Sequence, residues 1–127
     1  MSRVRIVLFA GRDGSVPLLD WLADLPPKAR AKCRLLLGQL AERGHELRRP
    51  AADYLRNGIY ELRTKHQRVN YRMLYFFHQR WTVVLSHGFS KQAGPVPERD
   101  IELALRRKSA FENAPEAHTL EEDIEGP

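Results

Sequence analysis

Three apolar runs of this sequence carry cationic or titratable side chains in their interiors. The runs are residues 59–64, 69–77 and 82–89. Tyr, Val, Phe, Leu and Met dominate them, and short polar loops separate them, which is typical of neighbouring antiparallel strands. Arg63 lies in the first run, Arg72 in the second and His87 in the third. A charged group among strand hydrophobes loses hydration unless its face is open to water or to an anion. The pattern therefore indicates an anion-binding face on a sheet.

The expected turns place these three side chains in one row across the sheet. If the chain turns at residues 67–68, Arg63 lies opposite Arg72. If it turns again over residues 78–81, Arg72 lies opposite His87. A slip of one residue would move a partner to the other face, because successive residues of a strand point to opposite faces. Like charges that face each other directly repel, so an anion bound beside the row would offset this repulsion.

Metal-free cleavage of RNA is the chemistry that these residue types fit. The 2′-hydroxyl of the RNA attacks the adjacent phosphate, and the protein must move protons and stabilise extra negative charge on the phosphorane. Arginine suits the charge, because its planar fork matches a phosphate and it keeps its proton. Histidine or lysine suits proton transfer when its surroundings adjust its pKa. The residues that supply these types in or beside one sheet region are Arg63, Lys65, His66, Arg72, His87 and Lys91.

Several of these residues also have ordinary structural explanations. Lys65 and His66 fit a hairpin turn, and His87 fits a hydrogen-bonded structural histidine near the end of a strand. Arg63 and Arg72, which sit among strand hydrophobes, are the residues for which the sequence favours function most.

Two further residues are candidates for contact with RNA outside this set. Tyr60 can stack on a base or simply pack against its neighbours. Arg56 lies beside the first strand, at the end of a polar connection over residues 44–57. That connection is either a solvated linker or a loop that faces RNA.

The composition describes one small basic domain with an acidic end. The chain of 127 residues is 43% apolar and 29% charged, as in ordinary globular domains. Residues 1–111 hold 21 Lys and Arg against 10 Asp and Glu, a net charge of +11, whereas residues 112–127 hold 6 acidic residues and no Lys or Arg. A body so basic favours nucleic acid or an acidic partner, although some proteins with a high isoelectric point have no such ligand.

Several other classes of protein find no support in the sequence. The longest apolar run is too short to span a membrane and the N-terminus lacks the features of a signal peptide, so we expect a cytoplasmic protein. The motifs GxGxxG, GxxxxGK[ST] and HExxH are absent. Cys33 is the single cysteine and the histidines lack compact ligand spacing, so neither a metal nor another cofactor is expected.

The pattern as a whole predicts an α+β fold. The elements expected besides the three strands are an N-terminal strand at residues 3–10, helices at 16–25 and 27–43, and a last helix at 97–111. The first two helices would form a hairpin that covers one face of an antiparallel sheet. Residues 112–127 have too little apolar content to fold, which predicts an acidic, disordered tail after a domain at 1–111.

A combination of short motifs makes the chain resemble a known family. The motifs are YELR, YRMLYF and HGFSK within residues 59–91, with LLDWLADLPPKARAKCRLLLGQL upstream and PERDIELALRRK downstream. Together they resemble the RelE/HigB family of toxins from type II toxin–antitoxin systems, and in particular its phage-derived HigB-like branch. The resemblance covers roughly residues 3–111.

This resemblance implies a RelE-like fold and an endoribonuclease that cuts ribosome-bound mRNA without a metal and so arrests translation. It also implies a small antitoxin partner, often a helix-turn-helix protein. The basic RNA-facing residues of the family fall here on Arg63, Arg72 and Lys91, and His87 and His66 are the candidates for proton transfer. The loop QAGPVP after HGFSK carries no charge, unlike the longer basic loop of many relatives. The alternative is a non-catalytic module that retains affinity for RNA or an antitoxin.

Overall fold

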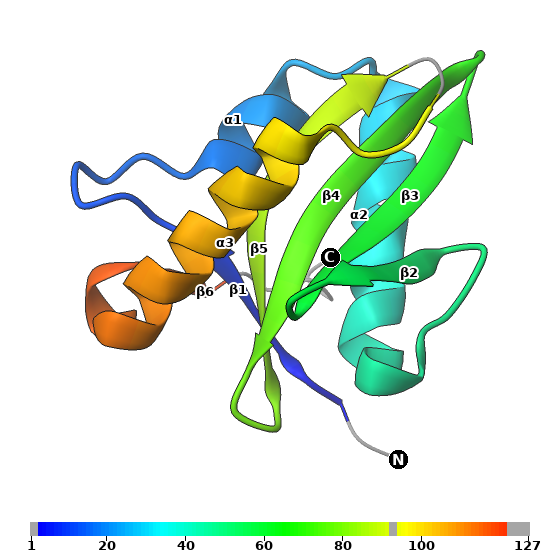
Figure 1. Cartoon of the computed structure of the whole chain (residues 1–127). Helices are drawn as coiled ribbons and strands as arrows, with labels where there is room; N and C mark the ends of the chain where they lie inside the picture. The colour runs from blue at the N-terminus through cyan, green and yellow to red at the C-terminus, as the bar shows by residue number, and fades with distance from the viewer. Residues whose placement is uncertain (1–2, 92–93, 122–127) are drawn as a thin grey trace.

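The computed structural model describes residues 3–91 and 94–121 as one sheet with helices on both faces (Figure 1). The strands are β1 (Arg5–Phe9), β2 (Ala52–Arg56), β3 (Ile59–His66), β4 (Val69–His78), β5 (Thr82–Lys91) and β6 (Thr119–Glu121). The helices are α1 (Pro17–Ala23), α2 (Pro27–Arg43) and α3 (Glu98–Asn113), with short 3₁₀ turns η1 (Gly44–Glu46) and η2 (Pro115–Ala117). The predicted α+β fold, with its N-terminal strand, helical hairpin and C-terminal helix, is confirmed.

The strand order in the sheet is β2-β3-β4-β5-β1-β6. The neighbours in this order pair antiparallel, except that β1 runs parallel to β5. The sheet is therefore mixed, whereas the sequence predicted an antiparallel one. The N-terminal strand lies between β5 and the short last strand, and its apolar residues alternate between the hydrophobic clusters on the two faces of the sheet.

Each face of the sheet buries its own hydrophobic cluster. The helices α1 and α2 cover one face, where Leu37, Leu62 and Leu85 are among the buried residues. The helix α3 covers the other face, where Leu74 and Phe111 are buried. We call these the α2 face and the α3 face. Because side chains alternate along a strand, this division fixes which functional residues can meet.

The hairpin between β3 and β4 has the predicted register. Gln67 and Arg68 have φ values of 51° and 70°, and a two-residue turn with both central φ angles positive matches the twist of the strands it joins. Arg63 therefore pairs directly with Arg72.

The predicted pairing of Arg72 with His87 is wrong. The loop between β4 and β5 has three residues rather than four, since His78 pairs with Thr82, and an irregularity at Leu74/Tyr75 shifts the register once more. Arg72 consequently lies opposite Phe89, and His87 lies opposite Leu74. The two shifts together amount to two residues, so His87 stays on the same face as Arg72.

Two short strands at the edges were not predicted. The segment 44–57 was expected to be a polar connection, but Ala52–Arg56 pairs with β3. Disorder was expected from residue 112, but α3 continues to Asn113, and Thr119–Glu121 pairs with β1. Residues 122–127 of the predicted tail lie outside the described residues. Such short strands gain their stability from the neighbouring strand, so their own apolar pattern is weak.

Candidate nucleic-acid interface

A buried cluster of charged side chains lies on the α3 face, at the end of the sheet where β3 turns into β4. Alternation along β3 puts Glu61 and Arg63 on this face together with buried Ile59, and Arg72 joins them from β4. Glu61 is 3% exposed and Arg72 8%, whereas the Arg63 side chain is 35% exposed. The structure thus brings the two predicted arginines together, with a carboxylate beside them.

Hydrogen bonding within this cluster is incomplete. Arg63 Nη1 lies 3.5 Å from Glu61 Oε2, and Arg72 Nε lies 3.8 Å from Glu61 Oε1. Both Arg72 Nε and Glu61 Oε1 are buried without a hydrogen-bond partner among the described residues. Burial raises the pKa of Glu61, an effect that exceeds the opposite one of Arg72 and Arg63. The N–H donor and the carboxylate oxygen that lack a hydrogen bond in the described part of the chain are thus both buried and face each other across 3.8 Å.

Backbone carbonyls hold the two guanidinium groups in place. Arg72 Nη2 donates a hydrogen bond of 2.9 Å to the carbonyl oxygen of Gly94, in the segment before α3. Arg63 Nε donates to the carbonyl oxygen of Pro50 at 3.1 Å, and its backbone N–H donates to Ala51. These bonds fix the side chains without neutralising them, because a carbonyl oxygen carries no net charge.

Lysines extend the positive charge along the same face. Lys91 pairs with Asn70, two residues before Arg72 on β4, so alternation puts it on the α3 face. Its Nζ donates to the carbonyl oxygen of Pro95 at 3.3 Å. A cavity of about 390 Å³ opens beside Arg63 and is also lined by Lys65, which is exposed. The predicted RNA-binding residues Lys65 and Lys91 thus lie near the two arginines.

His87 has a different environment, further along the α3 face. Its Nε2 lies 3.1 Å from Asp100 Oδ1 and its Nδ1 lies 2.8 Å from Ser86 Oγ. Burial lowers the pKa of His87, and Arg107 adds to this, although Asp100 acts in the opposite direction. The ring is therefore neutral at pH 7, with Nε2–H donating to Asp100 and Nδ1 accepting from Ser86. With both nitrogens engaged, the geometry supports a structural tie between β5 and α3 rather than proton transfer.

Three other predicted residues lie apart from the arginines. Alternation along β3 puts Tyr60 and His66 on the α2 face, and the partner of His66, Val69, packs against the α2-face cluster. Arg56 forms an ion pair with Glu98 at the start of α3. The fold therefore does not gather the predicted set into one site.

Glu61 is the residue that the sequence reasoning missed. The available signal was the motif YELR, in which Glu61 stands two residues before Arg63 and so shares its face. Glu61 is neither a cation nor a histidine, so the residue types that fit RNA cleavage did not point to it. Among the described residues no group of three or more His, Cys, Asp or Glu side chains is placed to hold a metal ion. In the same part of the chain no helix is long and apolar enough to cross a membrane.

Comparison with known proteins gives one family match. The family described as "Phage derived protein Gp49-like (DUF891)" matches residues 20–109, from α1 to within α3. This range includes the whole of β2 to β5 and every residue of the charged cluster. No curated protein matches the chain.

Proposed function

Because the chain belongs to the phage-derived Gp49-like family, which is related to the HigB/RelE-like toxins of toxin–antitoxin systems, we propose that it is a toxin that cleaves mRNA. The proposal includes ribosome-bound mRNA as the substrate and a small antitoxin, possibly of the helix-turn-helix class, as the neutralising partner. The observation that carries it is the pair of arginines on one face of the sheet, where the buried Arg72 Nε has no hydrogen-bond partner among the described residues.

Arg63 and Arg72 are proposed to stabilise the charge that develops on the phosphate. When the 2′-hydroxyl attacks, an additional negative charge appears on the phosphorane oxygens. The two guanidinium groups, held at Pro50 and Gly94, keep their positive charge beside the position proposed for the phosphate. Lys91, on the same face, is proposed to hold the RNA backbone. Since His87 is engaged and His66 lies on the α2 face, water is proposed to take the proton of the 2′-hydroxyl and to supply one to the leaving 5′-oxygen. The contribution proposed for the protein is stabilisation of charge.

Glu61 is proposed to act as a positioning residue that sets the charge of this site. When it is ionised, it offsets part of the charge on Arg63 and Arg72; when it is protonated, both guanidinium charges act on the phosphate. Its raised pKa brings the exchange between these two states closer to neutral pH.

Cell-free translation with primer extension on the mRNA tests this function. The wild-type protein is expected to leave discrete cuts, and Arg72→Ala is expected to reduce the cleavage rate by at least about 100-fold, as when a charge-stabilising donor is removed. Arg80→Ala is the matched control, because it removes one positive charge from an exposed residue of the β4–β5 loop. Full cleavage by a folded Arg72→Ala protein would refute the mechanism. Cys33, which is fully buried, reports folding through its protection from thiol reagents.

A second function, binding without catalysis, is favoured by one observation. Arg72 is only 8% exposed and its Nη2 already donates to Gly94, so the resting structure presents little of its guanidinium to a substrate. Expression in cells without a partner separates the two functions. Growth arrest with cut mRNA supports the endoribonuclease, whereas harmless expression of folded protein supports a module that binds RNA or an antitoxin.

A further inference from the structure

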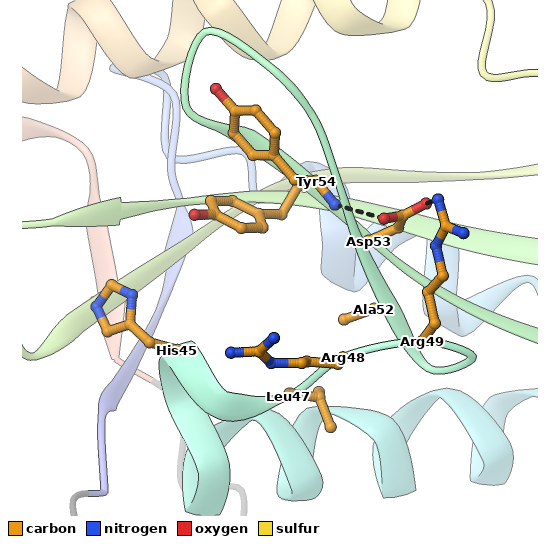
Figure 2. A pocket seen from close by; sticks show the side chains of 8 residues that line it. His45, Leu47, Arg48, Arg49, Ala52, Asp53 and Tyr54 are labelled. Atoms are coloured by element: carbon orange, nitrogen blue, oxygen red, sulfur yellow. Dashed lines mark hydrogen bonds and ion pairs between the residues drawn. The ribbon is translucent and has the colours of Figure 1, made fainter.

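A second cavity, of about 420 Å³, lies on the α2 face near the edge of the sheet (Figure 2). Its lining comes from η1 and the turn that follows it, and from the first residues of β2 and β3. The lining residues include His45, Leu47, Arg48, Ala52, Tyr54 and Tyr60. Its volume lies within the range of small-molecule sites. None of the roles proposed above for the arginines or Glu61 uses this cavity.

Aromatic rings form its most prominent surface. Tyr54 is 53% exposed, and its ring packs edge-to-face against Tyr60 at 5.0 Å between centroids. The Tyr54 hydroxyl accepts a hydrogen bond of 3.0 Å from the backbone N–H of Gly58, which fixes the orientation of the ring. Tyr60 is supported by stacking on Tyr75 at 5.3 Å. Tyr54 therefore presents to solvent an aromatic face that is already held in place.

The charges in this cavity are distributed unequally. Arg49 forms an ion pair with Asp53 at 3.0 Å, and this contact lowers the pKa of Asp53. Arg48 is exposed, and among the described residues no hydrogen bond or ion pair neutralises it. In Figure 2 the guanidinium of Arg48 extends across the cavity toward His45, below Tyr54. One cation is thus paired within the protein, and the other is free to meet an anion.

We infer that this cavity binds one nucleotide of a single-stranded RNA, with its base stacked on Tyr54 and its phosphate on Arg48. An aromatic face beside a guanidinium group is the combination by which proteins hold unpaired bases. A protein helix would need apolar surface, but the aliphatic lining residues Leu47 and Ala52 are 9% and 1% exposed and offer little of it.

The segment 48–51 connects this cavity to the arginine cluster. The turn over residues 48–51 separates it from the cavity beside Arg63, which Pro50 and Ala51 line. The carbonyl oxygens of Pro50 and Ala51 accept hydrogen bonds from Arg63. An RNA strand that leaves Arg63 and crosses this turn reaches Tyr54. The inference rests on the proposed function only in taking RNA as the ligand, since it requires no cleavage.

Binding to an RNA that cannot be cut tests the site separately from catalysis. A fluorescein-labelled, fully 2′-O-methylated single strand lacks the attacking hydroxyl, and its Kd is measured by anisotropy. Tyr54→Leu and Arg48→Gln are each expected to raise the Kd by at least about five-fold. Tyr54→Phe loses the hydrogen bond from Gly58 but keeps the ring and its edge-to-face contact with Tyr60, so it should bind much more tightly than Tyr54→Leu. The matched controls are Trp81→Leu and Arg80→Gln, which alter another exposed aromatic residue with an arginine beside it.

Two further measurements complete the test. With a strand whose bases are removed, wild type and Tyr54→Leu should bind equally, because only stacking distinguishes them. With 4-thiouracil in an RNA of natural sequence, ultraviolet cross-links should map to the peptide that holds Tyr54. An unchanged Kd for Tyr54→Leu, or one raised equally by Trp81→Leu, would overturn the inference. So would variants that lose an antitoxin while they keep RNA, which would identify a protein interface. Loss of cleavage in Arg72→Ala bears on the proposed function and leaves this result untouched.

Discussion

Two groups of polar and charged residues on the α3 face differ in how completely their atoms are hydrogen-bonded. The bonded cluster contains Ser86, His87, Asp100 and Arg107, and the open cluster contains Glu61, Arg63 and Arg72. In the bonded cluster both ring nitrogens of His87 have partners, and Arg107 donates to the carbonyl oxygen of Ser86 at 2.9 Å. In the open cluster Glu61 Oε1 and Arg72 Nε are buried and have none among the described residues.

This difference assigns the two clusters to different tasks. A buried polar atom without a partner costs free energy, so folded proteins rarely retain one unless something else compensates. The bonded cluster joins β5 to α3 and needs no ligand to do so. The open cluster retains a donor, Arg72 Nε, without a hydrogen bond among the described residues, and our proposal is that this cluster acts on a phosphate. Substitutions of His87 and Glu61, together with the pH dependence of their effects, test this difference.

Replacing His87 should affect folding much more than chemistry. His87→Ala removes a buried ring and leaves Asp100 without its donor, so we expect the free energy of unfolding to fall by about 2–3 kcal/mol. Urea unfolding measures this as a lower midpoint with an unchanged slope. Cleavage per folded molecule should stay within about three-fold of the wild type. If folded His87→Ala is inactive, the histidine takes part in the chemistry and the comparison fails.

Replacing Glu61 should have a smaller effect on stability than replacing His87, and it should raise the free energy of unfolding. Because the folded pKa of Glu61 is raised above its value of 4.5, its stabilising contribution is complete below pH 4.5 and is lost as the pH rises through the folded pKa. Glu61→Gln avoids this loss and keeps an oxygen near both guanidinium groups. It should stabilise the protein by about 0.5–1 kcal/mol at pH 7 and tighten RNA binding.

The pH dependence distinguishes this effect from an ordinary surface change. The stability gain of Glu61→Gln should shrink as the pH falls towards 4.5, and Glu102→Gln, at an exposed position of α3, should show no gain at any pH. Thermal unfolding across this pH range is the measurement. A loss of stability at pH 7 would mean that the ionised carboxylate is needed to hold the two arginines.

The smallest expected effect is the pH dependence that His87 contributes. Its folded pKa is depressed below 6.5, so the stability that depends on it is complete above pH 6.5 and is lost as the pH falls through the folded pKa. The difference in unfolding free energy between wild type and His87→Ala should therefore narrow below pH 6.5. A difference that widens on acidification would show that His87 carries a charge in the folded protein.

The parts of the fold that sequence predicts well are those set by local geometry. The pairing of Arg63 with Arg72 follows from a two-residue turn, which leaves no freedom in register. The pairing of β4 with β5 includes an irregularity at Leu74/Tyr75, and the residue types at that position do not predict it. A register inferred from loop length alone therefore could not place His87 correctly.

Residues that are close in sequence do not necessarily share a site. Tyr60 and His66 stand close to Arg63 along the chain, but each is an odd number of positions away on the same strand, so their side chains lie on the other face. Glu61 was passed over although it is two positions away and shares the face. The partners of Glu61 and His87, and hence their pKa directions, become visible only when the strands and α3 are assembled.

The short strand β6 determines what the sheet can do at that edge. It pairs with Val7, Leu8 and Phe9 of β1, a strand in which every residue except Arg5 is buried, and it is anchored where Ala10 and His118 exchange hydrogen bonds. A chain that ended before His118 would expose the backbone donors and acceptors of an apolar strand, which readily recruits extended segments of other molecules. The three residues of β6 therefore occupy the pairing positions on β1 that such a segment would take.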